Sequence, residues 1–186
     1  MINNIPFYFF SRKTSRIFCT GIILFFLFSV NFSFAQSDTL EIINLYDKAL
    51  DFDDSKVDSL ELYIILIEKN SKKLDYDKGE IFSTRLKGIK AEFTGDFNTA
   101  ISCYLHCLDL SRDAKLSKYE SSALSDLAYV NMQLKNPAKA KEYYQQSTIK
   151  KKNGGEAISI ISNLTNLGGI CNQLGQTDSA LFYLNE

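Results

Sequence analysis

A 40-residue repeat runs through this chain and constrains its fold more than any other feature. Ala100, Ala140 and Ala180 mark its equal steps, and a second small residue precedes each of them by twelve positions. These preceding residues are Gly88, Ala128 and Gly168. A period of this size is typical of supersecondary units that stack, because one unit cannot bury its hydrophobic face without a neighbour. The period therefore predicts an array of similar units.

Within each unit the apolar residues follow a helical period, as in the run from Leu124 to Leu134 and again from Leu164 to Leu174. We therefore predict an all-α fold, a right-handed α-solenoid of antiparallel helix hairpins. The predicted hairpins pair residues 39–52 with 57–73, 79–94 with 97–112, 118–134 with 137–152, and 157–174 with a helix from 177 onward. We expect the small residues to meet where the helices cross, with Gly88 facing Ala100, Ala128 facing Ala140 and Gly168 facing Ala180.

The first 35 residues differ from the rest of the chain. They contain no acidic residue, and three basic residues precede an apolar run from Ile17 to Val30. The segment ends in Ser33-Phe34-Ala35, so its order is typical of a secretory signal peptide. We expect cleavage after Ala35 and export to the periplasm or cell envelope. The alternative is an uncleaved anchor, because Ile17 to Ala35 gives 19 mostly apolar residues, enough to span a bilayer.

Charge and cysteine content exclude two further classes. Without residues 1–35 the chain has 18 basic and 22 acidic residues, a net charge of −4, which gives no basic surface for nucleic acid. The three remaining cysteines are Cys103, Cys107 and Cys171, and they fall at helix-packing positions. Three cysteines cannot all pair, so we predict no disulfide framework.

Several motifs resemble the tetratricopeptide repeat (TPR). They are Leu127-Ala128, Leu167-Gly168, Gly95-Asp96-Phe97 followed by Ala100 and Tyr104, and Gly175 followed by Ala180 and Tyr183. The resemblance is good over residues 80–186, where we expect TPR-like repeats with the last one incomplete, and weak over 36–79, where we expect a degenerate first helical repeat. The unit is longer than the family's usual one, and the customary proline at the end of its second helix is missing.

The resemblance implies an exported scaffold that binds a protein or peptide partner, without catalysis of its own and without a cofactor. A signal peptide followed by 40-residue repeats is similar to exported TPR proteins of Bacteroidetes-type bacteria, many of which continue into a histidine kinase or a DNA-binding regulator. The alternative function is therefore the extracytoplasmic sensor region of such a signal-transduction protein, truncated here. Contact with a membrane would then come only from an uncleaved N-terminus or from a missing C-terminal region.

By analogy with the family, we expect the partner on a concave face formed by the first helix of each hairpin. The expected residues are Phe82, Arg85, Ile89, Glu92, Ser125, Tyr129, Met132, Thr165, Asn166, Asn172 and Gln173. The alternative is that these residues are only the solvated side of the array. Positions that bind an acidic peptide tail in some family members carry Arg85, Ile89, Asp126, Ser122 and Ser162 here. These residues do not form a cationic cluster, so the sequence disfavours an acidic tail as the ligand.

Other candidates for chemistry have simpler explanations. Cys103, His106 and Cys107 share one side of a helix and could hold a soft metal, but both cysteines fall on core positions. The acidic stretch from Asp51 to Asp58 has Lys56 where a calcium loop needs glycine, so we interpret it as a turn in which Asp54 or Ser55 caps the next helix. We predict no metal site. His106 is the only histidine and has no orienting partner that we can assign, so we predict no catalytic site.

Overall fold

The computed structural model describes residues 38–154 and 157–185, and every regular element in these ranges is a helix. One helix covers residues 38–50. It is followed by the 3-10 turn η1 (Asp54–Lys56) and by α2 (Val57–Leu74), α3 (Lys78–Phe93), α4 (Phe97–Asp113), α5 (Ser117–Gln133), α6 (Pro137–Gly154), α7 (Ala157–Gln173) and α8 (Thr177–Asn185). The all-α prediction is confirmed, and the observed helix ends agree with the predicted ones to within two residues. The predicted signal peptide, residues 1–35, lies outside the described residues.

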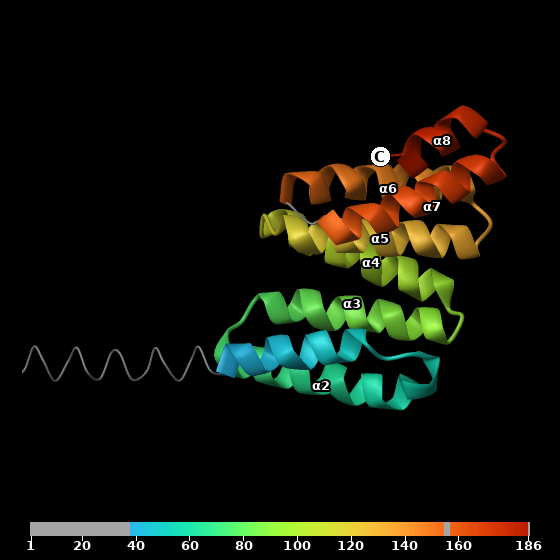
Figure 1. Ribbon diagram of the computed structural model, residues 1–186. Coiled ribbons are helices and arrows are strands. Elements are labelled where there is room, and N and C mark those ends of the chain that lie inside the picture. The colour runs from blue at the N-terminus through green and yellow to red at the C-terminus, as the bar shows by residue number, and fades with distance from the viewer. Residues whose placement is uncertain (1–37, 155–156, 186) are drawn as a thin grey trace, which may run out of the picture. The chain divides into compact units, whose positions relative to one another are not determined.

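Each helix packs against its neighbours in the sequence. Figure 1 shows α2 at one end of the array and α8 at the other, and the main packing contacts are between consecutive helices. This pattern is that of a TPR-like solenoid, in which a unit contacts only the units next to it. It also explains why the hydrophobic core is drawn out along the array: one buried cluster extends from Ile42 to Val130, and a second joins Ala128 to Ile170.

The helices end in the same kind of turn. The backbone is left-handed at Asp75, Gly95, Lys115, Lys135 and Gly175, each with φ between 52° and 76°. At each turn the next amide donates to the carbonyl five residues earlier, as Asp96 does to Ala91 at 2.8 Å. These are Schellman turns, which satisfy the last carbonyls of a helix and reverse the chain. The first four are evenly spaced, so a helix and its turn together make half of the 40-residue repeat.

The glycines of the repeat accommodate large side chains rather than the expected alanines. A Cβ atom placed on Gly88 would lie 2.4 Å from Cε1 of Tyr104, and one on Gly168 would lie 2.7 Å from Cγ of Leu184. Tyr104 and Leu184 come four residues after Ala100 and Ala180, one helical turn further along the same side. Gly88 and Gly168 thus leave room for a side chain one turn beyond the predicted alanine. Ala128 and Ala140, the third predicted pair, lie in the same buried cluster.

Candidate partner-binding face

Three helices, α3, α5 and α7, carry the residues expected to meet a partner, and we call these residues the recognition face. On α3 they are Phe82, Arg85, Ile89 and Glu92, spaced by three or four residues. Such spacing places side chains on one side of a helix. On α5 they are Ser125, Tyr129 and Met132, and on α7 they are Thr165, Asn166, Asn172 and Gln173.

Phe82 does not belong to the surface, which corrects the sequence prediction. Its ring is buried and stacks on Tyr46 with a centroid separation of 4.2 Å and an interplanar angle of 12°. The ring of Tyr119 meets it edge-on at 5.2 Å. Stacked and edge-to-face rings of this kind stabilise a core. Phe82 therefore joins the helix over residues 38–50 to α3 and cannot contact a partner unless this packing opens.

Arg85 is the central polar residue of the face. Its Nη2 donates to Oδ1 of Asp126 at 3.0 Å and its Nε donates to Oδ2 of the same carboxylate, while its Nη1 donates to the hydroxyl of Tyr46 at 2.8 Å. Burial by itself would lower the pKa of Arg85, but the Asp126 carboxylate raises that pKa above its ordinary value. The guanidinium is thus charged and already paired, and it connects three successive first helices.

Glu92 lies further along α3 and accepts a hydrogen bond from the hydroxyl of Tyr104 at 3.0 Å. Burial raises the pKa of Glu92 to about 7, although the hydrogen bond from Tyr104 acts in the opposite direction. Tyr104 itself is fully buried beside Gly88. The glycine therefore has an effect on the recognition face, because it admits the ring whose hydroxyl holds Glu92 in place.

Ser125 belongs to a polar junction between α5, α6 and α7. Its hydroxyl shares a 2.8 Å hydrogen bond with Ser147 and donates to Oδ1 of Asn163 at 3.2 Å. The Lys151 ammonium, which is buried, donates to Ser125 at 3.1 Å and to Asn163 at 3.3 Å. Buried polar groups are tolerated when they satisfy one another in this way. The junction joins the third and fourth units, and most of Ser125 is used inside the protein.

Residues 121–148, which cover most of α5 and the first part of α6, match the family model of the tetratricopeptide repeat. The same antiparallel hairpin precedes and follows this segment at the 40-residue step. The chain contains a tetratricopeptide repeat. The comparison with curated proteins gave no match.

The part of the TPR face that solvent reaches is smaller than the sequence suggested. Tyr129 is 44% exposed, Ile89 and Met132 are half-buried, and the four expected residues of α7 are all exposed. Thr165 uses its hydroxyl within α7, donating to the carbonyl of Ile161 at 2.9 Å. The face accessible to a partner thus combines an aromatic ring, two apolar side chains and several amides, and its arginine is neutralised by Asp126.

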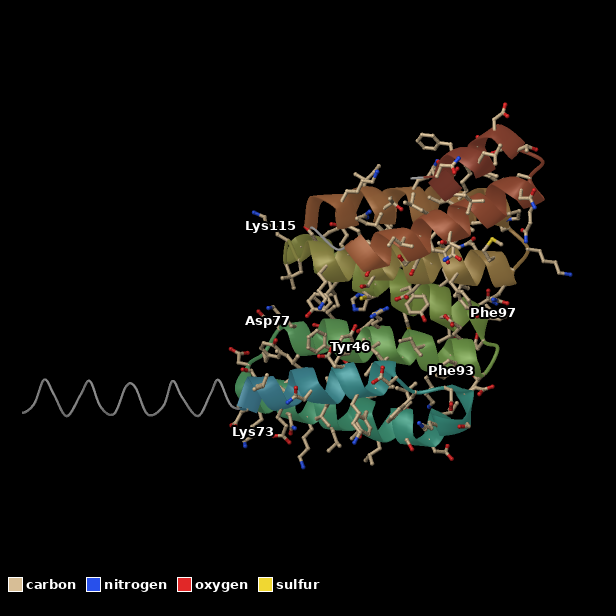
Figure 2. All side chains as sticks on the ribbon, viewed as in Figure 1. Tyr46, Lys73, Asp77, Phe93, Phe97 and Lys115 are labelled. Carbon is tan, nitrogen blue, oxygen red and sulfur yellow. The ribbon has the colours of Figure 1, made fainter. Side chains whose placement is uncertain are left out.

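Next to this face the TPR protein has an open pocket that the sequence did not indicate. It is lined by the aromatic residues Phe52, Phe93, Phe97 and Tyr129, the acidic residues Asp53, Asp54 and Glu92, and Gln133. Figure 2 labels Phe93 and Phe97 on the two sides of the turn between α3 and α4. Only Glu92 and Tyr129 were expected at a binding site. The other residues come from a connection and from helix ends, where no helical period marks them.

The acidic connection contains a turn, as predicted, but a different residue makes the cap. Oδ1 of Asp53 accepts hydrogen bonds from the backbone N–H of Ser55 at 3.2 Å and from its hydroxyl at 2.5 Å. Asp53, rather than Asp54 or Ser55, is therefore the residue that caps η1. This replaces the capping residue that we had expected in this part of the TPR protein.

Cys103, His106 and Cys107 do not converge on a common point. Cys107 is buried and burial raises its thiol pKa to about 12, whereas His106 is exposed and lies 3.7 Å from the Glu80 carboxylate. In the ranges that the structure describes, no three histidine, cysteine or acidic residues are grouped so as to hold a metal ion. None of the described helices combines the length and the apolar character needed to cross a membrane.

Proposed function

We propose that this TPR protein is an exported scaffold that binds an extended segment of a protein partner along the recognition face, without catalysing a reaction. TPR proteins are typically interaction scaffolds, and the repeat at residues 121–148 supports this general role. The main support for the binding site is the accessible part of the recognition face, which combines the exposed Tyr129 ring with half-buried apolar side chains and exposed amides. Aromatic groups surrounded by polar ones are the composition of protein interfaces.

The pairing of Arg85 supports a partner other than an acidic peptide tail. An acidic tail needs cations that are free to pair with it, but both terminal nitrogens and Nε of Arg85 donate to Asp126 and Tyr46. A carboxylate arriving there would compete with Asp126 at the same guanidinium. The mild acidity of the chain after residue 35 likewise supports a protein partner over nucleic acid.

The N-terminal segment supports a place in the periplasm or the cell envelope. A basic start, a short apolar run and Ser33-Phe34-Ala35 form the pattern that signal peptidase cleaves. N-terminal sequencing of the chain purified from its native cells should therefore begin at Gln36. A chain that still begins at Met1 would show that the segment is retained as an anchor.

Site-specific photo-crosslinking in native cells tests the binding function. A photoreactive phenylalanine analogue at position 129, on the recognition face, should join the chain to one defined protein. The matched control is position 105 on α4, because Leu105 is 40% exposed and Tyr129 is 44% exposed. Equal crosslinking at both positions, or none at either, would contradict the proposed face.

A further inference from the structure

The open pocket beside the recognition face combines two kinds of group that seldom line one cavity. It has a volume of about 570 Å³, and its walls come from the connection before η1, from both sides of the α3–α4 turn, and from the last turns of α5. Four aromatic and three acidic residues line this space. A ligand that enters must satisfy both kinds of group at once.

The rings are available to a positive charge. The Tyr129 ring is 44% exposed, and Phe93 and Phe97 are half-buried, so each presents part of its surface. The Phe52 ring already attracts a cation, since the Lys56 ammonium lies 5.3 Å from its centroid. The negative face of an aromatic ring draws an ammonium or guanidinium group, and several rings around one cation add their effects.

The acidic residues of the pocket form no ion pair with a lysine or arginine in the described part of the chain. None of Asp53, Asp54 and Glu92 lies within 4.0 Å of a lysine or arginine nitrogen there. The cap made by Asp53 uses one of its two oxygens, Oδ1. An apolar ligand would take water from these carboxylates without replacing it, and an anionic ligand would be repelled by them. A cation supplies what both the rings and the carboxylates require.

We propose that this pocket binds the basic side chain, lysine or arginine, of the partner segment that lies along the recognition face. The inference rests on the proposed function, since Glu92 and Tyr129 belong both to the pocket and to that face. A long basic side chain suits an open pocket at the edge of a face, because its stem can lie against Phe93 and Phe97 while its charged head reaches the carboxylates. Selectivity for basic segments then comes from the pocket, and the rest of the face contributes general contacts.

A pair of peptides tests this directly on the full 186-residue chain. One heptapeptide has a central arginine between serine and glycine residues, and the other has citrulline, which keeps the shape of arginine without its charge. Titration followed by amide NMR should shift signals of residues 52–54, 92–97 and 129–133, with the arginine peptide binding at least about tenfold more tightly than the citrulline peptide. Equal binding of the two peptides, no binding of the arginine peptide, or shifts confined to other residues would overturn the proposal.

Two double variants complete the test. Tyr129→Ala with Asp54→Asn removes an exposed ring and an exposed carboxylate from the pocket, and it should weaken binding of the arginine peptide by about tenfold or more. Leu62→Ala with Asp109→Asn removes an exposed apolar side chain and an exposed carboxylate from α2 and α4, away from the pocket, and it should leave binding unchanged. Equal effects of the two double variants would also refute the site.

The two proposals fail in distinguishable ways. If position 129 crosslinks one protein but the arginine and citrulline peptides bind alike, the scaffold function stands and the basic-side-chain pocket is wrong. If the arginine peptide binds selectively but no protein is crosslinked at position 129, the selectivity of the pocket for a basic side chain stands, and its role in holding a partner segment fails together with the partner-binding function.

Discussion

Gly88 and Gly169 offer a controlled measurement of how tightly the helix hairpins are packed. Both lie inside helices, so replacing either with alanine improves helix propensity by about 1 kcal/mol. A Cβ atom at position 169 meets nothing within 4 Å, whereas at position 88 it would lie 2.4 Å from Cε1 and 2.8 Å from Cδ1 of Tyr104. Tyr104 is fully buried and its hydroxyl is bonded to Glu92, so the ring cannot move aside without breaking other contacts.

Gly169→Ala should therefore raise the free energy of unfolding by about 1 kcal/mol. Gly88→Ala gains the same propensity but also forces the hairpin apart, and overpacking of this kind costs about 1–3 kcal/mol. The two variants should consequently differ by about that overpacking cost, with Gly88→Ala the less stable. Urea unfolding followed by circular dichroism measures the difference, provided that the m-values agree.

A variant that lacks the Tyr104 ring tests whether contact with this ring causes the loss of stability. In a Tyr104→Leu chain the ring is absent, so Gly88→Ala should recover most of the propensity gain. If Gly88→Ala were as stable as Gly169→Ala in the parent chain, the close approach of α3 and α4 would not be the reason for glycine at position 88.

The turns, the paired arginine and Glu92 each give one further prediction. Gly95 has φ of 76° and no atom near an added Cβ, so Gly95→Ala should lower stability by about 1–2 kcal/mol through backbone strain alone. Lys135 adopts the same left-handed conformation at φ 57°, so Lys135→Gly should raise the melting temperature. Changes of the opposite sign in calorimetry would contradict this. Arg85→Met should cost about 3 kcal/mol by leaving the largely buried Asp126 carboxylate, 17% exposed, without its partner. Lys87→Met, which breaks an exposed pair with Glu68, should cost less than about 1 kcal/mol; similar losses in urea unfolding would refute the contrast. The pKa of Glu92 is about 7 in the folded chain, against an ordinary value of 4.5, so the folded chain holds this proton more tightly than the unfolded chain. The resulting contribution to stability is present below pH 4.5 and lost as the pH rises through 7. Glu92→Gln should flatten the dependence of stability on pH over that range, and an unchanged dependence would show that another group causes it.

The helices could be predicted well from the sequence because the features that set them are local. Ala100, Ala140 and Ala180 fix the phase, and breaks such as Lys135–Pro137 fix the turns, so helix ends were placed to within two residues. The burial of Phe82 could not be predicted in the same way. It depends on Tyr46, which lies in the degenerate first helix and supplies the ring that covers it. A periodic pattern shows which side of a helix is repeated but not which neighbour covers that side.

The pocket was missed for a related reason. Phe52 and Asp53 lie in the connection before η1, Asp54 begins η1, and Phe93 and Phe97 flank a turn. The pocket therefore forms only when three separate chain segments are brought together. The acidic residues were visible in the sequence as a possible calcium loop or turn. Their position beside four aromatic rings depends on the packing of α3 and α5 against the first hairpin, which no spacing along the chain records.

The even spacing of the Schellman turns makes the length of the array adjustable in whole hairpins. Left-handed turns fall at positions 75, 95, 115, 135 and 175. Several hydrogen bonds between the first helices of successive units join residues separated by 38 to 41 positions, as in Tyr46 with Arg85, Arg85 with Asp126, and Ser125 with Asn163. Inserting or removing one complete repeat between two equivalent turns would keep residues one repeat apart in position to form such hydrogen bonds. A change of half a repeat would instead exchange the helices that carry the recognition face for those that do not. Protein engineers could therefore lengthen or shorten the binding surface in steps of one hairpin, with the turns as natural points of ligation.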